Sequence, residues 1–370
     1  MKYFNLIIVI LCFYSCEDVE LSENNITKKL DALTNSEIVD IAGISLSVVE
    51  NNSEKSTFSG YSDKNRTSKI YKDQPFRVAS ITKTFVAATI FRLQEEGLLS
   101  INDPVSKFIS QKHIDILKLG GYNPDQILIK QCLNHTSGLF DYAVGQTGNG
   151  SSPYINIATN NPNKVWTRTE QIEGAMTWGK PYGNPGEVYS YSDTGYLILG
   201  EIIENLTNKN IGIAIRDVLD FKKMNLKHTW YEKYEDYQTK DVISRYFYNI
   251  DFTHFDASID LYGGGGIIST TKDLATFYHF LFKGDIFNNK ETLTLFISEV
   301  NTSKSSKDYR NGFEVLNIYG QDAYYHSGIW NTQVIYLPNL DTAIAINFTE
   351  KKSDYLLKNI IYSLTNQAKK

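Results

Sequence analysis

The sequence predicts an α+β fold: one antiparallel sheet built from both chain termini, flanked by helices, with a mainly helical lobe inserted between its two halves. Strand-like runs lie near each end of the chain, and patterns of helical period occupy much of the stretch between them. Apolar residues make up 42% and charged residues 21% of the 370 residues, so the chain can bury a substantial core. A sheet of this kind buries its apolar faces under helices.

The N-terminal half of the sheet is expected from two runs, residues 43–50 and 55–61. Asn51-Asn52 between them is a turn signal, so the two strands should be neighbours. The next expected element is a helix over residues 79–96. Its apolar side chains recur near the helical period, and Gly97 can end it.

The inserted lobe and the second half of the sheet follow. Helical patterns cover residues 191–205 and 271–282 within a region otherwise rich in Gly, Asn, Pro and Tyr. Residues 333–337 and 342–348 are strand-like and are separated by a short turn. A final helix is expected from about residue 353. The predicted sheet therefore combines strands that lie far apart in the chain.

The first residues have the pattern of a targeting segment. Lys2 gives a basic start, and residues 6–13 form an uncharged apolar run. The run is shorter than the roughly 20 apolar residues that span a bilayer, but it suits the core of a signal peptide. Ser15-Cys16 then resembles a bacterial lipobox. We expect a signal peptide over residues 1–15 and a lipidated Cys16; the alternative is a plain secretory signal that leaves this cysteine free.

The expected domain organisation follows from this start. Residues 16–40 should carry the lipid and form a polar tether, and residues 41–370 should form one domain. The protein is then expected to be exported and held by its lipid on a bacterial membrane, in the periplasm or at the cell surface. A formal charge of −5 without a basic stripe gives no reason to expect a nucleic-acid partner.

The cysteines and histidines exclude two other kinds of site. Once Cys12 is removed and Cys16 is acylated, Cys132 remains alone in an apolar stretch. It is expected to be a core residue, and no disulfide framework is implied. The six histidines are scattered along the sequence. Neither a metal nor another cofactor is therefore expected.

Ser80 and Lys83 form a candidate nucleophile and base. Residues three apart on a helix lie on one face, so the lysine can reach the serine hydroxyl, and a serine needs an adjacent base to act as a nucleophile. Ser269 and Lys272 have the same spacing. Ser80 heads an apolar helix that must be buried, whereas Ser269 follows a glycine run and is expected to be a helix N-cap.

Three motifs in order resemble those of the serine β-lactamase and penicillin-binding family. They are Ser80-Ile81-Thr82-Lys83, Tyr191-Ser192-Asp193 and His326-Ser327-Gly328. The tyrosine in the second motif resembles the branch of class C β-lactamases, D-alanyl-D-alanine carboxypeptidases and related esterases; class A enzymes have Ser-Asp-Asn there. The likeness spans about residues 40–365. Companion stretches extend it, at residues 133–139, 191–196 and 264–270.

The resemblance implies roles for these residues. Ser80 is the expected nucleophile. Lys83 and Tyr191 are the expected base system, in which Tyr191 acts as a phenolate or a relay and protonates the leaving group. His326 replaces the usual lysine of the third motif and is expected to orient Tyr191 and a substrate carboxylate. The family carries this motif on an edge strand of its sheet.

The third motif is also expected to bind substrate through Ser327, Gly328 and Ile329. The resemblance implies that the backbone N–H groups of Ser80 and Ile329 form the oxyanion hole. Such a hole stabilises the charge that develops on the carbonyl oxygen during acyl transfer.

One residue departs from the family pattern. Asp193 stands where the family has asparagine, whose amide can donate to a substrate carbonyl; an ionised carboxylate can only accept. Asp193 is a substrate-binding candidate with two interpretations. It either pairs with Lys83 and changes the role of that lysine, or accepts from a backbone N–H of its own loop.

The expected function is an exported serine hydrolase that forms an acyl-enzyme on Ser80. The expected substrate is a small molecule or short peptide, with a cell-wall peptide and a β-lactam among the candidates. A D,D-carboxypeptidase, a D-amino-acid peptidase or an esterase is preferred, because His326 replaces the lysine of dedicated class C β-lactamases. The alternatives are a class C-like β-lactamase and a penicillin-binding sensor without turnover. An α/β-hydrolase is disfavoured because the sequence contains no Gly-x-Ser-x-Gly motif.

Overall fold

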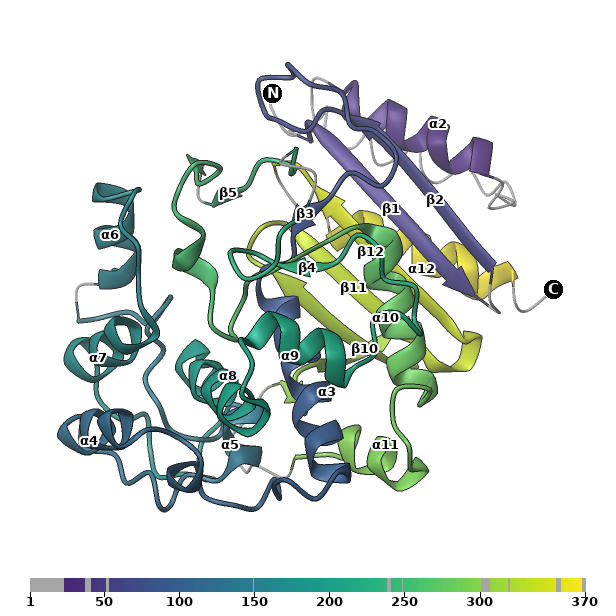
Figure 1. Cartoon of the computed structure of the whole chain (residues 1–370). Coiled ribbons are helices and arrows are strands. Elements are labelled where there is room, and N and C mark those ends of the chain that lie inside the picture. Colours follow the sequence, from purple (N-terminus) through teal and green to yellow (C-terminus); the bar gives the residue numbers. More distant parts are fainter. Residues whose placement is uncertain are drawn as a thin grey trace.

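A seven-stranded antiparallel sheet joins the two ends of the chain in a computed structural model (Figure 1). The strand order is β2-β1-β12-β11-β10-β9-β8. The strands are β1 (Gly43–Glu50), β2 (Ser53–Gly60), β8 (Asp308–Tyr309), β9 (Glu314–Ile318), β10 (Gln321–Gly328), β11 (Thr332–Leu337) and β12 (Thr342–Phe348). The structure describes residues 23–36, 41–50, 53–148, 150–237, 241–247, 249–300, 307–318, 320–350 and 354–367. The predicted signal peptide and Cys16 lie outside them.

The centre of the sheet is the pairing of β1 with β12. The register runs from Ile44 opposite Phe348 to Glu50 opposite Thr342, so the strands pair along their full lengths. The predicted α+β fold is confirmed: both termini contribute strands, and the residues between them are mainly helical (Figure 1).

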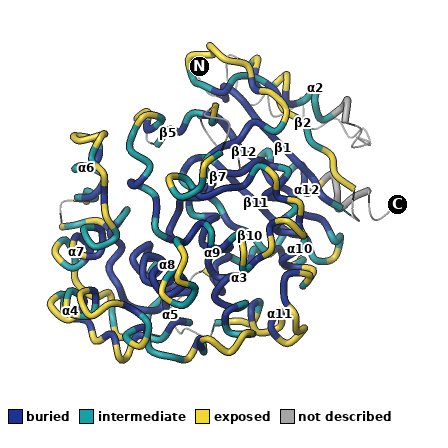
Figure 2. Tube along the Cα trace, in the orientation of Figure 1, coloured by how far each residue is buried: buried dark blue, intermediate teal, exposed yellow. Residues whose placement is uncertain are grey.

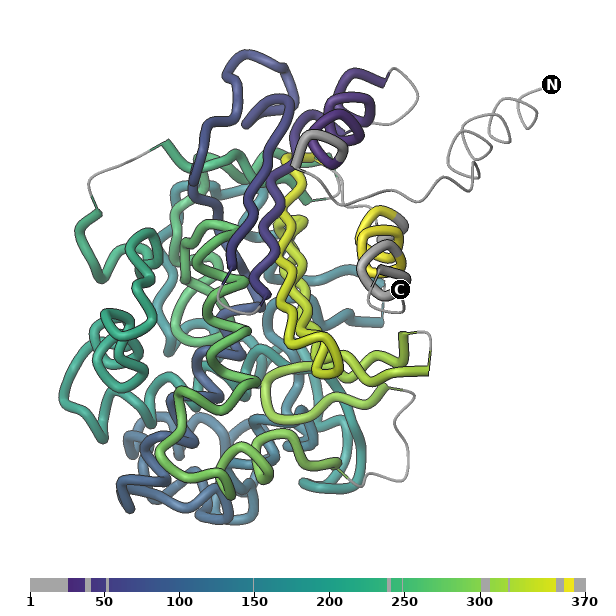
Figure 3. Tube along the Cα trace, turned by 90° about the vertical axis from the view of Figure 1, so that its right-hand side faces the viewer, coloured from purple at the N-terminus to yellow at the C-terminus, as the bar shows by residue number. Residues whose placement is uncertain are grey.

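Both faces of the sheet are covered, because apolar side chains alternate along its strands. On β11, Val334 and Tyr336 belong to the large core cluster under the helical lobe, whereas Ile335 and Leu337 belong to a second cluster on the opposite face. Figure 3 shows the sheet nearly edge-on, with α2 (Glu23–Thr34) and α12 (Asp354–Gln367) on one side and the rest of the chain on the other.

Helix α2 corrects the tether prediction. Residues 16–40 were expected to carry the lipid and form a polar tether, but residues 23–34 form a helix. Leu30 is buried in the second core cluster, and the hydroxyl of Thr34 lies 2.8 Å from that of Ser59 on β2. A few apolar residues at helical spacing are enough to dock a mostly polar helix on a sheet.

The helical lobe is arranged around α3 (Thr82–Glu95), which follows the short 3-10 turn η1 (Ala79–Ile81). Helices α3 and α8 (Asp193–Thr207) contact each other and are buried along most of their lengths (Figure 2). Helix α10 (Thr271–Lys283) packs on the sheet beside them. The remaining helices are α4 (Gln111–Leu119), α5 (Ile129–Leu133), α6 (Pro153–Asn160), α7 (Arg168–Trp178), α9 (Ile211–Val218) and α11 (Lys290–Phe296).

A small second sheet holds the entrance to α3. Its strands are β3 (Phe76–Arg77), β7 (Ile267–Ser269) and β4 (Trp230–Tyr231), in that order. The N–H of Val78 also donates to the carbonyl of Ile267 at 3.0 Å. This sheet fixes the chain just before Ser80. A separate hairpin pairs β5 (Tyr246–Phe247) with β6 (Ile250–Asp251). No helix among the described residues is long and apolar enough to cross a membrane.

Candidate active site

Ser80 lies in the sharp turn that opens α3. The preceding residue, Ala79, has a φ of +48°, which is strained for a residue with a Cβ and is typical of functional sites. The end of β10 packs against this turn so closely that a Cβ on Gly328 would lie 2.2 Å from the carbonyl oxygen of Val78. Glycine in the third motif therefore lets β10 approach the nucleophile.

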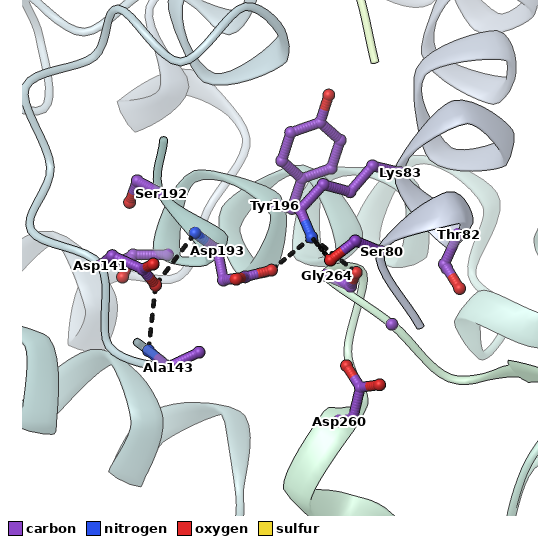
Figure 4. A network of polar contacts seen from close by, with 12 residues as sticks. Ser80, Thr82, Lys83, Asp141, Ala143, Ser192, Asp193, Tyr196, Asp260 and Gly264 are labelled. Carbon is purple, nitrogen blue, oxygen red and sulfur yellow. Dashed lines mark hydrogen bonds and ion pairs between the residues drawn. The ribbon is translucent and has the colours of Figure 1, made fainter. Parts of the chain in front are cut away.

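Lys83 is fully buried and lies at the centre of the site (Figure 4). Its Nζ donates to Ser80 Oγ at 2.9 Å and to the carbonyl oxygen of Gly264 at 2.8 Å. It also forms an ion pair with Asp193. An ammonium has three N–H donors, so each donor has an acceptor. The burial expected for this lysine from the apolar helix is confirmed.

The ion pair decides between the two interpretations of Asp193. The carboxylate faces Lys83, and its own backbone N–H donates to Asp141 at 3.3 Å (Figure 4). The first of the two interpretations is therefore confirmed: Asp193 pairs with Lys83. Asp193 begins α8, where a carboxylate is also favoured by the helix dipole.

A glycine loop brings a backbone carbonyl to Lys83. Gly263 has a φ of +126°, and a Cβ there would lie 2.2 Å from the carbonyl oxygen of Tyr196. A Cβ on Gly264 would lie 2.6 Å from Asp193 Oδ1. The loop can approach the ion pair only if residues 263 and 264 lack side chains, which explains these two glycines. A Cβ on Gly265 or Gly266 would instead meet the side chain of Asp260 or of Tyr231.

Tyr191 lies next to both Ser80 and Lys83. The Lys83 ammonium is 5.1 Å from the centroid of its ring. Burial, followed by the charge of Asp193, raises the pKa of Tyr191 well above its ordinary value, although a hydrogen bond with the side chain of Ser80 opposes this shift. A phenolate is therefore disfavoured in the resting site, and Tyr191 is present as the neutral phenol.

His326 lies on β10, where β9 no longer pairs with the strand: the β9 register ends at Tyr325. The residues of the third motif therefore have no partner on β9, although β10 itself is an inner strand of the sheet and not an edge strand. Nδ1 of His326 contacts the carbonyl oxygen of Ser327, and Nε2 contacts the hydroxyl of Tyr309, both at 2.9 Å. Since a carbonyl only accepts, Nδ1 carries the proton and Nε2 accepts from Tyr309.

The charge of His326 follows from its surroundings. Burial, with a further contribution from the Lys83 charge, lowers the pKa of His326 to about 3. The ring is neutral at physiological pH. It differs in this respect from the lysine that the family usually has in the third motif.

Three further residues of the site were missed by the sequence interpretation. Tyr309 is buried and lies between His326 and Tyr191, with a ring centroid 6.0 Å from that of Tyr191. Asp141 and Asp260 lie near Asp193 (Figure 4). One tyrosine among 25 carries no distinguishing pattern, and the two aspartates are separated by more than 100 residues in the sequence.

The two additional carboxyls are strongly affected by their surroundings. Burial, then the charge of Asp193, raises the pKa of Asp141 to about 7. Burial also raises the pKa of Asp260, whose Oδ2 accepts from the indole N–H of Trp330 at 2.8 Å. The Lys83 ammonium therefore lies among several acidic groups.

The second Ser-x-x-Lys segment has no part in this arrangement. Ser269 is buried on β7 and contacts the hydroxyl of Thr229 at 2.9 Å. The N-cap of α10 is Thr270, whose side chain accepts from the N–H of Asp273. The predicted cap at Ser269 was thus wrong by one residue, because boundaries are the least certain part of a helix pattern. Lys272 pairs with Glu54 instead of a serine.

The structure also shows the surroundings of Cys132 and of the side chains that could ligate a metal. Cys132 is buried among apolar residues, as predicted, and burial raises the pKa of its thiol to about 12, so it is not a nucleophile. Within the described ranges, no group of three or more His, Cys, Asp or Glu side chains is placed to hold a metal ion.

Comparisons with known proteins show that the fold is shared with solved structures. A solved structure of the D-amino acid amidase from Ochrobactrum anthropi SV3, complexed with L-phenylalanine amide, superposes with a TM-score of 0.75. The match covers 94% of this chain and 99% of that one at 21% identity, which shows the fold.

Two curated relatives are similar in sequence. Penicillin-binding protein 4* of Bacillus subtilis (strain 168) is 25% identical over 315 residues, which are 80% of this chain and 65% of the relative. Protein flp of Staphylococcus aureus (strain MW2) is 32% identical over 183 residues, which are 49% of this chain and 32% of the relative. The matched parts therefore span less than two thirds of either relative. The Beta-lactamase family model matches residues 32–364, and the chain belongs to this family of serine hydrolases and penicillin-binding proteins.

Proposed function

We propose that this protein is a hydrolase that forms an acyl-enzyme on Ser80 and cleaves amides or esters of short substrates. The observation that carries the proposal is the placement of Lys83 Nζ at 2.9 Å from Ser80 Oγ, with the Tyr191 ring beside the same ammonium, its centroid 5.1 Å from Nζ. A nucleophile in contact with both a cation and a proton relay is the arrangement that acyl transfer requires.

The proton route follows from the donors and acceptors. All three N–H groups of the Lys83 ammonium have acceptors, and Tyr191 is a neutral phenol. As Ser80 Oγ bonds to the substrate carbonyl carbon, its proton passes to Tyr191 Oη. The phenol proton passes in the same step to the leaving nitrogen or oxygen, whose bond to that carbon breaks. Water reverses the route in deacylation, and the Lys83 ammonium stabilises the charge that develops on Oγ.

The close approach of β10 supports the proposed oxyanion hole. Gly328 packs against the turn that contains Ser80, so the N–H groups of Ser80 and Ile329 come from adjoining segments. We propose that these two groups bind the carbonyl oxygen, while Ser327 and Gly328 line the substrate site. Loss of one such donor typically costs about 3 kcal/mol of transition-state stabilisation.

The charges of the site favour some substrates over others. His326 is neutral, and the charge of Lys83 is balanced by Asp193. Neither residue offers a free cation to a substrate carboxylate, which penicillin and D-alanyl-D-alanine peptides both carry. We therefore propose a neutral ester, or an amino-acid amide with a free ammonium group, as the preferred substrate. The similarity in fold to a D-amino acid amidase supports an amide.

Intact-mass spectrometry tests the proposal against its alternatives. The protein is mixed with penicillin G, an acyl-D-alanyl-D-alanine peptide, D-phenylalanine amide or p-nitrophenyl acetate. We expect turnover of the last two, a transient mass increase that is lost in Ser80→Ala, and slow acylation by the first two. Fast turnover of the dipeptide would identify a D,D-carboxypeptidase. Fast penicillin hydrolysis would identify a β-lactamase, and a stable penicilloyl adduct without turnover of any substrate would identify a sensor.

We also propose that the protein is exported and anchored through lipid on Cys16. The support is the sequence pattern around this residue. In the native host, Cys16→Ser should abolish metabolic labelling with a fatty acid and move the protein from the membrane to the soluble fraction. A variant that keeps its label, or that stays in the membrane fraction, would contradict the lipid anchor.

A further inference from the structure

The loop at residues 133–139, which the sequence resemblance singled out, lies against the segment that leads to Tyr191. Three backbone hydrogen bonds join the two segments. Tyr182 N–H donates to Gly138 O at 2.9 Å, and Gly186 N–H donates to Thr136 O at 2.7 Å. Ser190 N–H donates to His135 O at 2.9 Å. The loop therefore fixes the backbone of the segment that leads to Tyr191.

His135 holds this segment on both sides of Tyr191. Its carbonyl accepts from Ser190, the residue before the tyrosine, and its Nδ1 accepts from the N–H of Ser192, the residue after it, at 3.1 Å. The imidazole also packs on the phenol: the ring centroids are 4.1 Å apart and the planes are 34° apart. One residue therefore fixes both the backbone and the ring of Tyr191.

The conformation of His135 indicates that this contact is maintained against an energetic cost. The residue has a φ of +59° and is 1% exposed. Because Nδ1 accepts, the proton of the neutral ring lies on Nε2, for which the described part of the chain supplies no hydrogen-bond partner. A strained backbone and an unpaired buried donor persist only where the surroundings or the function require them.

The ring also remains in the state that this contact needs. Burial, then the charge of Lys83, lowers the pKa of His135 well below its ordinary value. A protonated ring would carry a hydrogen on Nδ1 that points at the Ser192 N–H and would break the bond. The neutral ring can hold Tyr191 over the whole range of working pH.

We propose that His135 is a positioning residue that places the Tyr191 hydroxyl on Ser80. It acts through Tyr191 and does not touch the reacting atoms. The inference rests on the proposed function, in which Tyr191 relays the proton between Ser80 and the leaving group.

Two substitutions separate the contacts of His135. His135→Asn keeps a positive φ at low cost and keeps an acceptor for the Ser192 N–H, but it removes the ring. His135→Phe keeps a ring against Tyr191 and removes the acceptor. Each is made in the wild-type chain and in Tyr191→Phe, and the rate of acylation by p-nitrophenyl acetate is measured in single turnovers.

We expect each His135 variant to lower the acylation rate of the wild-type chain by roughly tenfold to a hundredfold, because small displacements of a reacting group are costly. KM should change little, and the shape of the pH–rate profile should be kept. In Tyr191→Phe the same changes should lower the rate by less than about twofold, since the hydroxyl that His135 positions is already absent.

His113 supplies a matched control. It is a buried histidine in the helical lobe, bonded to Glu201 at 2.6 Å and Thr169 at 2.9 Å. His113→Asn should lower the thermal midpoint of unfolding. Any change that it causes in the acylation rate should be the same in the wild-type chain and in Tyr191→Phe. Equal losses for the His135 variants in both backgrounds, or folded variants of normal rate, would overturn the inference. So would failure of both variants to fold, because the role would then be structural. If the single variant Tyr191→Phe acylates at the wild-type rate, the result would instead contradict the proposed role of the tyrosine.

Discussion

At the scale of single residues, two serines of the same local pattern have different surroundings. Ser80 contacts a buried lysine in a strained turn, whereas Ser269 contacts Thr229 inside a small sheet. Ser80→Ala should abolish acylation by p-nitrophenyl acetate, and Ser269→Ala should leave at least about half of the rate, as expected for a residue outside the reaction path. Mass spectrometry of the two variants checks this. Acylation of the Ser80 variant would mean that the nucleophile lies elsewhere.

Asp193→Asn tests the residue that departs from the family pattern. The ion pair with Lys83 is lost, and an amide that can donate to a substrate carbonyl is gained. We expect faster acylation by penicillin G and by amides relative to p-nitrophenyl acetate, and a shift of the acidic limb of the pH–rate profile. The measurement is kcat/KM for the three substrates between pH 5 and 9. An unchanged ratio and parallel profiles would show that Asp193 does not influence the reaction.

The residues that the sequence could predict are those of the ordered motifs. Ser80 and Lys83 are close in sequence, so helix geometry alone predicts their contact. The sequence could not identify Tyr309 and Asp141 as site residues, because their roles depend on the packing of segments that are distant in the chain. Tyr309, for example, contacts His326 only because β8 pairs with β9 and β9 pairs with β10. The sequence left two alternatives for Asp193, and the ion pair with Lys83 in the structure decides between them.

At the scale of elements, the turn between β8 and β9 is fitted to α3. Gly312 has a φ of +83°, and a Cβ there would lie 2.7 Å from that of Ala87 and 2.9 Å from the carbonyl oxygen of Lys83. The hydroxyl of Thr84 donates to the carbonyl of Gly312 at 2.7 Å. The turn between β8 and β9 therefore packs closely against α3, which carries Lys83 and follows the turn that contains Ser80.

Gly312→Ala should destabilise the protein and slow catalysis together. The positive φ alone costs about 1–2 kcal/mol, and the contacts with α3 add to it. Gly97→Ala, at the end of the same helix, is the control: its φ is +73°, but a Cβ there would meet no atom within 4 Å. Urea unfolding and kcat of both variants check the prediction. Equal losses of stability, with normal activity in both, would show that the contacts of Gly312 do not matter.

The long apolar elements were predictable, and the short ones were not. The helix at residues 79–96 and the strands at 43–50 and 342–348 have clear periodicity, and each is present with ends within a few residues of those expected. The two-residue strands β3 and β4 are too short to show any period. Helix α2 was missed because only its buried stripe is apolar.

At the scale of the whole molecule, the buried carboxyl of Asp141 links stability to pH. Its pKa is raised to about 7 in the folded protein from an ordinary value of 3.8, so the folded state holds a proton that the unfolded chain releases. The resulting stabilisation is present below about pH 4 and is lost as the pH rises to about 7. Asp141→Asn removes this titration while keeping an acceptor for the N–H groups of Ala143 and Asp193.

The free energy of unfolding of Asp141→Asn, minus that of the wild type, should therefore become more positive between pH 5 and pH 8. The size of the change is on the order of a few kcal/mol at most. Urea unfolding at several pH values measures it. Parallel curves for the two proteins would show that Asp141 ionises as easily when folded as when unfolded.

The pairing of β1 with β12 has a consequence for biosynthesis. During translation, residues 43–50 emerge long before residues 342–348, with which they pair. Until then β1 lacks one of its two neighbours, and such open edges invite wrong partners and favour binding by chaperones. Ser80 is also made early, but His326 and Gly328, which complete its surroundings, arrive only with β10. The nascent protein therefore carries its nucleophile through much of its synthesis without the rest of the site, and should begin to acylate only once β10 has been made and packs against the turn that contains Ser80.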